Sequence, residues 1–128
     1  MNVKSFWRTI TWTIIIIVLC SLPGSQFPKG NFLNISHLDK WVHGSLYFIW
    51  GFLCLYEFCI VQGRQNTHLL KTFFIGMLLG GLVELYQHTL IPNRMGDVWD
   101  FLANDVGLIL SLITFYYYTK KRDNELTV

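Results

Sequence analysis

Charged residues are scarce in this chain. Asp, Glu, Lys and Arg together make up 14% of its 128 residues, whereas about 25% is usual in soluble globular domains. Apolar residues reach 52%, and the mean hydropathy is +0.39. A soluble domain of this size needs more polar surface than this composition supplies. The scarcity of charge therefore argues against a water-soluble protein.

Cysteine and net charge are equally sparse. The three cysteines, Cys20, Cys54 and Cys59, all lie inside apolar runs. An odd number of cysteines in such surroundings is typical of small buried hydrophobes, not of a disulfide framework or a zinc site. The formal net charge of +2 is too small to indicate a nucleic-acid partner.

Long apolar runs are what the chain has in abundance. A helix that crosses a bilayer needs about 20 mostly apolar residues. Four segments meet or approach this length, each bounded by turn or charged residues: 6–22, 41–61, 72–91 and 99–118. The sequence therefore predicts one all-α domain over residues 1–128, an integral membrane four-helix bundle.

The first apolar segment has a second interpretation, as a signal peptide. Lys4 and Arg8 precede it, as basic residues do in such peptides. No small-x-small cleavage site follows it, however, so we expect a retained membrane anchor.

The basic residues predict the orientation of the spans. Seven of them would lie on one side of the membrane: Lys4, Arg8, Arg64, Lys71, Lys120, Lys121 and Arg122. The other side would hold three: Lys29, Lys40 and Arg94. Because cytoplasmic loops carry the excess of Lys and Arg, we expect both termini in the cytoplasm (N-in/C-in).

Polar residues at membrane depth are costly, and each needs a partner or water. Glu84, Gln87 and His88 share roughly one face of the third span, because they are three and four residues apart. Asp100 and Asn104 share a face of the fourth span in the same way. With the predicted orientation, the candidate site residues fall near the outer surface of the bilayer: Asp39, Lys40, His43, Glu84, Gln87, Arg94, Asp100 and Asn104.

This cluster has two interpretations. It is either a buried polar network that holds the helices together, or an outward-facing pocket in which Lys40 and Arg94 bind anionic oxygens while Glu84 and Asp100 accept hydroxyls or move protons. No metal site or cofactor is predicted, because only Glu84 and His88 show local i,i+4 spacing. Glu57 is expected to reach the cytoplasmic interface or pair with a basic residue there. His37 and His68 are expected to be solvated loop residues.

The same residues resemble motifs of the VanZ-like family over nearly the whole chain. Asp39-Lys40-Trp41-Val42-His43 resembles its Asp-Lys-x-x-His motif, and Glu84-Leu85-Tyr86-Gln87 resembles its Glu-x-x-Gln motif. Arg94, Asp100, Asn104 and Gly107 resemble its later Arg…Asp-x-x-x-Asn-x-x-Gly series. The resemblance implies a multi-pass protein of the bacterial cytoplasmic membrane. The founding member of the family is associated with low-level resistance to a glycopeptide antibiotic, a role that a family match alone does not transfer.

Three functions fit these features. The favoured one is a non-enzymatic membrane protein that binds or shields a lipid-linked cell-envelope precursor or an amphiphilic glycopeptide antibiotic. The second is a membrane enzyme that modifies such a head group by acid–base chemistry. The third is a structural assembly partner. Gly76 and Gly80, a small-xxx-small pair on the third span, give the only hint of a homodimer.

Overall fold

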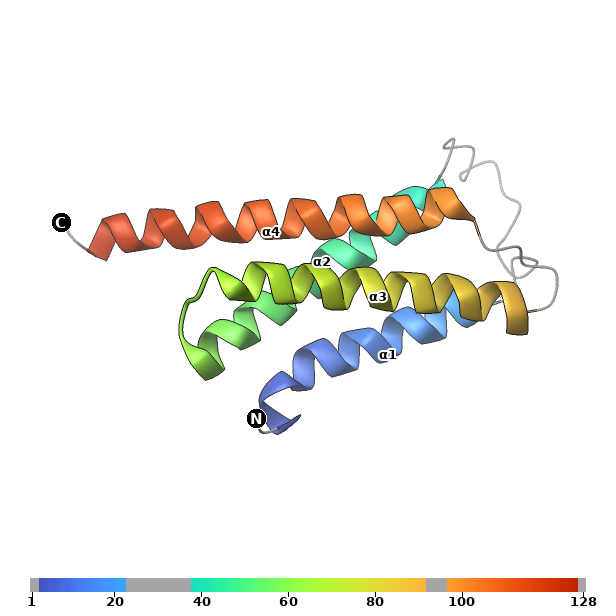
Figure 1. The fold of residues 1–128 in the computed structure, drawn as a ribbon, viewed down its shortest axis with the longest axis horizontal. Helices are drawn as coiled ribbons and strands as arrows, with labels where there is room; N and C mark the ends of the chain where they lie inside the picture. The colour runs from blue at the N-terminus through green and yellow to red at the C-terminus, as the bar shows by residue number, and fades with distance from the viewer. Residues whose placement is uncertain (1–2, 23–37, 92–96, 127–128) are drawn as a thin grey trace.

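The computed structural model describes residues 3–22, 38–91 and 97–126. This part of the chain is all helical, as predicted. A short 3-10 helix, Val3–Phe6, leads into four α-helices: α1 (Trp7–Ser21), α2 (Leu38–Gln62), α3 (Thr67–Leu90) and α4 (Val98–Leu126). Successive helices run in opposite directions, so that α1 begins and α4 ends at the same end of the molecule (Figure 1).

Three helices are long and apolar enough to cross a membrane: Leu38–Gln62, Thr67–Leu90 and the Val98–Arg122 part of α4. These spans indicate a membrane protein. The remaining helix, α1, has 15 residues and is therefore about 22 Å long, shorter than the hydrocarbon core of about 30 Å. Among the described helices, the structure thus bears out three of the four predicted spans by length and apolar composition.

Three helices, α2, α3 and α4, extend beyond one end of their predicted spans because polar residues continue them. α2 starts at Leu38 instead of residue 41, α3 starts at Thr67 instead of residue 72, and α4 continues past residue 118 to Leu126. Between α2 and α3, Gly63 has φ +72°, the left-handed conformation in which glycine commonly ends a helix. The apolar run therefore locates each helix but not its ends.

α2 is the central helix, and it packs against each of the other three. In Figure 1 it passes behind α3, between α1 and α4. α2 and α4 approach so closely that a Cβ atom on Gly107 would overlap the carbonyl group of Gly44. This contact holds the N-terminal parts of α2 and α4 together, and those parts carry most of the candidate site residues.

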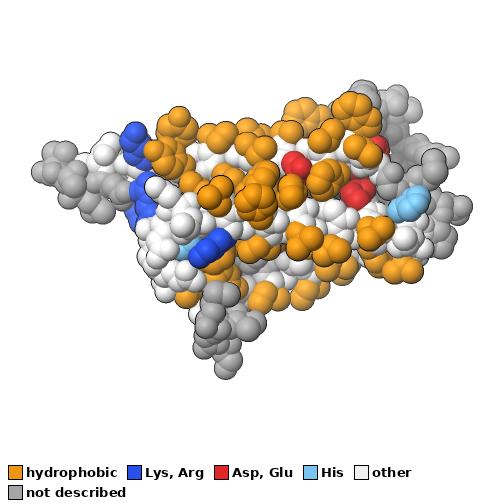
Figure 2. All heavy atoms as spheres, in the orientation of Figure 1, with side chains coloured by type: hydrophobic (Ala, Val, Ile, Leu, Met, Phe, Trp, Pro, Cys, Tyr) orange, Lys and Arg blue, Asp and Glu red, His pale blue; other side chains and the backbone are white. Residues whose placement is uncertain are grey.

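Side chains of opposite charge gather at opposite ends of the molecule. Figure 2 shows apolar side chains over the middle of one face, Lys and Arg near the end of α4, and Asp and Glu toward the other end. We call the end at which α2 and α4 begin and α3 finishes the acidic end.

α1 is held in place by hydrogen bonds that it donates to α2. The fully buried carboxylate of Glu57 accepts hydrogen bonds from the backbone N–H groups of Arg8 (2.9 Å) and Thr9 (3.1 Å) and from the Thr9 hydroxyl (2.7 Å). The Arg8 guanidinium lies 3.8 Å away. Glu57 does pair with a basic residue, as expected, and it also caps the start of α1.

One sequence-based expectation proves wrong. His68 is not a solvated loop residue: it lies in the first turn of α3, 1% exposed, with its ring stacked on Phe58 at 5.0 Å. The Gly76/Gly80 face is not a free surface, because Gly76 packs against Leu108 and Trp50, while Gly80 faces Asn104 and Tyr47. That face packs between helices of the same chain, and the homodimer stays a prediction. His37 lies outside the described residues.

Candidate functional site

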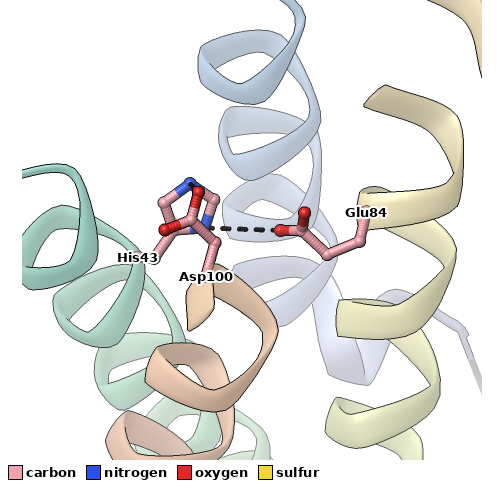
Figure 3. Close-up of side chains that lie close together, drawn as sticks. All are labelled: His43, Glu84 and Asp100. Carbon is pink, nitrogen blue, oxygen red and sulfur yellow. Dashed lines mark ion pairs between the residues drawn. The ribbon is translucent and has the colours of Figure 1, made fainter. Parts of the chain in front are cut away.

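Three ionisable side chains from three helices converge at the acidic end. Figure 3 shows His43 of α2, Glu84 of α3 and Asp100 of α4 pointing toward one another. Nδ1 of His43 lies 3.9 Å from Oε1 of Glu84, and Nε2 lies 3.8 Å from Oδ2 of Asp100. The three side chains are between 4% and 11% exposed. We call these three residues the His43 cluster.

Lys40 lies beside this cluster and binds the carboxylates around it. We call Lys40, Asp39 and Asp97 the rim of the site. Its ammonium group donates hydrogen bonds to Asp39 (3.0 Å), Asp97 (2.9 Å) and Asp100 (3.0 Å). Within the described part of the chain, the rim and the cluster together hold the carboxylates of four residues and one ammonium group, that of Lys40. The carboxylates belong to Asp39, Glu84, Asp97 and Asp100. The described part of the site is therefore rich in carboxylate oxygens, which accept hydrogen bonds from ligand donors.

Asp97 connects the rim to the start of α4. Its Oδ1 accepts the backbone N–H of Trp99 at 2.9 Å, as an N-cap aspartate does, while Oδ2 accepts Lys40. These two hydrogen bonds hold the pKa of the Asp97 carboxyl below its usual value of 3.8, the bond from Lys40 being the larger cause. Asp97 also donates its backbone N–H to Oε2 of Glu84 at 3.3 Å. One residue therefore positions groups from α2 and α3.

A fully buried polar layer lies beneath the cluster. Oδ1 of Asn104, which is 0% exposed, lies 3.2 Å from Nδ1 of His43. Among the described residues, neither the amide nitrogen of Asn104 nor the hydroxyl of Tyr47 has a hydrogen-bond partner. Because buried polar atoms are nearly always hydrogen-bonded, this layer is suited to a water molecule or a polar ligand group.

The structure brings together most of the residues that the sequence singled out. Six of the eight predicted site residues lie at the acidic end: Asp39, Lys40, His43, Glu84, Asp100 and Asn104. Gln87 does not join them; it is 1% exposed and donates from Nε2 to the backbone oxygen of Cys20 at 3.0 Å. Arg94 lies outside the described residues. Sequence reasoning did not select Asp97, although an Asp just before an apolar helix is a typical N-cap signal.

An apolar groove adjoins the site. It lies between α2 and α4, has a volume of about 600 Å³, and is lined by ten residues: Lys40, Trp41, Gly44, Ser45, Phe48, Ile49, Ala103, Val106, Gly107 and Leu110. From Lys40 to Ile49 it follows α2 for about 14 Å, which is close to half the thickness of the hydrocarbon core. Lys40 belongs to both the groove and the rim.

Comparison with known proteins adds no identification, since no family model, curated protein or solved structure matches the chain. The VanZ-like resemblance accordingly stays a prediction from the motifs.

Proposed function

We propose that this chain is a multi-pass protein of the bacterial cytoplasmic membrane, with both termini in the cytoplasm, that binds an amphiphile of the cell envelope at its acidic end. The head group would lie against the rim and the His43 cluster, and its hydrocarbon chain in the groove between α2 and α4. The observation that carries this proposal is that Lys40 belongs to both parts of the site. It lines the apolar groove, and its ammonium group donates hydrogen bonds to Asp97 and Asp100.

The dimensions of the groove support a hydrocarbon chain as its occupant. A length of about 14 Å along α2 corresponds to roughly one leaflet of the bilayer. The floor consists of small residues such as Gly44, Ser45, Ala103 and Gly107. Larger side chains at these positions would fill the groove, so the small residues leave room for a hydrocarbon chain.

The carboxylates of the described site indicate which groups the head would offer. Carboxylate oxygens accept hydrogen bonds, which favours a head that offers hydroxyl, amide or ammonium donors. A lipid-linked sugar precursor and an acylated glycopeptide both carry such donors beside a hydrocarbon chain. In the VanZ-like interpretation these are also the two ligand classes of interest.

The test is native mass spectrometry of the full chain, purified from bacterial membranes in mild detergent, followed by titration with a polyprenyl-linked disaccharide and with an acylated glycopeptide. Ser45→Trp fills the groove, whereas Val42→Trp changes an exposed residue of the same helix that does not line it. We expect Ser45→Trp to weaken amphiphile binding about tenfold or more, and Val42→Trp to leave it unchanged.

Two results would contradict this function. Equal binding by both tryptophan variants would show that the groove holds no ligand. A co-purified amphiphile with a chemically altered head group, absent from Glu84→Gln, would instead favour the enzyme.

A further inference from the structure

We propose that the carboxyl group of Asp105 is a proton-binding site within the membrane, a neutral acid at neutral pH that borders the lipid beside the contact between α3 and α4. Asp105 lies inside the Val98–Arg122 span of α4, about 10 Å along the helix from Val98. An ionisable side chain at membrane depth is costly unless its charge is compensated, and such residues are commonly functional. Asp105 belongs neither to the rim, nor to the His43 cluster, nor to the lining of the groove.

Asp105 lies on the side of α4 where the protein core meets the lipid. Leu102 and Ile109, three residues before and four residues after it, share its face of the helix and are 44% and 42% exposed. On its other side, Leu108 is 0% exposed and packs against Gly76 of α3. The Asp105 side chain is partly exposed, whereas its Oδ1 atom is buried. One carboxyl group therefore borders both the lipid and the contact between α3 and α4.

No group among the described residues compensates a negative charge on Asp105. Its buried Oδ1 has no hydrogen-bond partner, and none of the described Lys, Arg or His side chains forms an ion pair with it. Tyr47 of α2 interacts electrostatically with Asp105, and the same hydroxyl interacts with Glu84 of α3 and Cys20 of α1. These three titratable neighbours come from the three other helices, and none of them is a cation. Because a carboxyl group in such surroundings binds a proton instead of remaining charged, we assign the neutral acid to Asp105.

Glu57 shows the opposite arrangement at membrane depth in the same chain. It is 0% exposed, but its carboxylate accepts three hydrogen bonds from Arg8 and Thr9, and the Arg8 guanidinium lies 3.8 Å away. Asp105 has no such contact among the described residues. The two residues thus separate burial from charge compensation, and they should differ in their reaction with a reagent dissolved in the lipid.

The test is labelling of the full chain in lipid vesicles with dicyclohexylcarbodiimide, an apolar reagent that reacts with neutral carboxylic acids. The acid adds across one C=N bond: its proton moves to nitrogen and its oxygen bonds to the central carbon. The adduct then rearranges to a stable N-acylurea that contains all atoms of the reagent. At neutral pH we expect one adduct per chain, which mass spectrometry of fragments locates on Asp105. The yield should fall as the pH rises, because the carboxylate lacks the proton that the reaction needs.

Two variants make the assignment specific. Asp105→Asn keeps the shape of the side chain but removes the acid, and it should abolish the adduct. Asp97→Asn is the matched control, because Asp97 lies outside the span and is bonded by Lys40, and this variant should keep the adduct. Infrared spectroscopy adds a measurement that does not require the reagent to reach the site. The wild-type chain at neutral pH should show the C=O band of a neutral carboxylic acid, and Asp105→Asn should lack it.

Several results would overturn the proposal. Wild-type protein with neither the adduct nor the infrared band would show that Asp105 is ionised. Equal labelling of Glu57 and Asp105 would show that burial alone decides the reaction. An infrared band without an adduct would overturn the position beside the lipid. The wild-type measurements need no substitution, so an unstable variant does not remove the test. None of these results depends on binding of an amphiphile, so this proposal and the proposed function can fail separately.

Discussion

Glu57 of α2 and Thr9 of α1 are joined by two hydrogen bonds: one carboxylate oxygen accepts both the backbone N–H and the hydroxyl of Thr9. Phe6, at the start of α1, makes no side-chain cap of its own. The carboxylate from a neighbouring helix therefore supplies the cap, at the helix end where the backbone dipole favours negative charge.

Removal of this cap should destabilise the fold. Glu57→Ala leaves two backbone N–H groups of α1 without their acceptor, and we expect a loss of about 2 to 4 kcal/mol in the free energy of unfolding. Thr9→Val removes only the hydroxyl bond and should cost about 1 kcal/mol or less. The free energies come from unfolding in mixed micelles of mild detergent and SDS. The double variant should lose less than the sum of the two single variants, and strict additivity would show that the two residues are not coupled.

The contact between Gly44 and Gly107 gives a prediction with a matched control. Gly107→Ala places a methyl group against the Gly44 carbonyl, which should push α2 and α4 apart and cost about 2 kcal/mol or more. A Cβ atom on Gly81 meets only Phe101, at 3.8 Å, so Gly81→Ala should change stability by about 0.5 kcal/mol or less. Both are measured by the same detergent unfolding. Equal effects of the two alanines would contradict the tight contact.

Lys40 should lower the pKa of the Asp97 carboxyl group. Because the pKa of Asp97 is held below 3.8 in the folded chain, the bond from Lys40 stabilises the fold above that pH. Its contribution is lost as the pH falls through the lowered pKa. Lys40→Met should bring the pKa of Asp97 back toward 3.8, as followed by ¹³C NMR of the carboxyl group in micelles. The Trp99 N–H remains in the variant, so a partial shift is expected, and no shift would contradict the ion pair.

Membrane topology can be tested at the two ends of the molecule. A cysteine at Gln65, in the turn between α2 and α3, should react with a membrane-impermeant thiol reagent only when cells are opened. A cysteine at Val98, which is 72% exposed at the start of α4, should react in spheroplasts. Cys59 is replaced by Ala in both variants because it is only partly buried, whereas Cys20 and Cys54 are buried. The reverse labelling pattern would place the acidic end in the cytoplasm.

The helices and most of the polar cluster could be predicted from the sequence, because a membrane restricts what apolar and ionisable residues can do. Apolar runs of about 20 residues had to form helices, since every backbone polar group in a bilayer needs a partner within the chain. Ionisable residues inside such runs had to find each other, which is why Lys40, His43, Glu84 and Asp100 were selected together.

Other features depend on contacts that no sequence pattern marks. Gln87 binds a backbone oxygen, that of Cys20, and every residue carries such an oxygen. His68 follows Asn66 and Thr67, which read as a loop, yet the helix starts there and buries the ring against Phe58. The small residues Gly76 and Gly80 indicated a close helix contact correctly, but spacing alone does not say whether the partner is a second chain or another helix of the same chain.

The hydrogen bonds of α1 carry a consequence for biosynthesis. The start of this helix is bonded by Glu57 and its end by Gln87, so its partners are made about 50 and 67 residues later than the groups they bind. A ribosome releases residues in order, and α1 leaves it while neither partner exists. α1 therefore cannot complete its native contacts until α3 has been made.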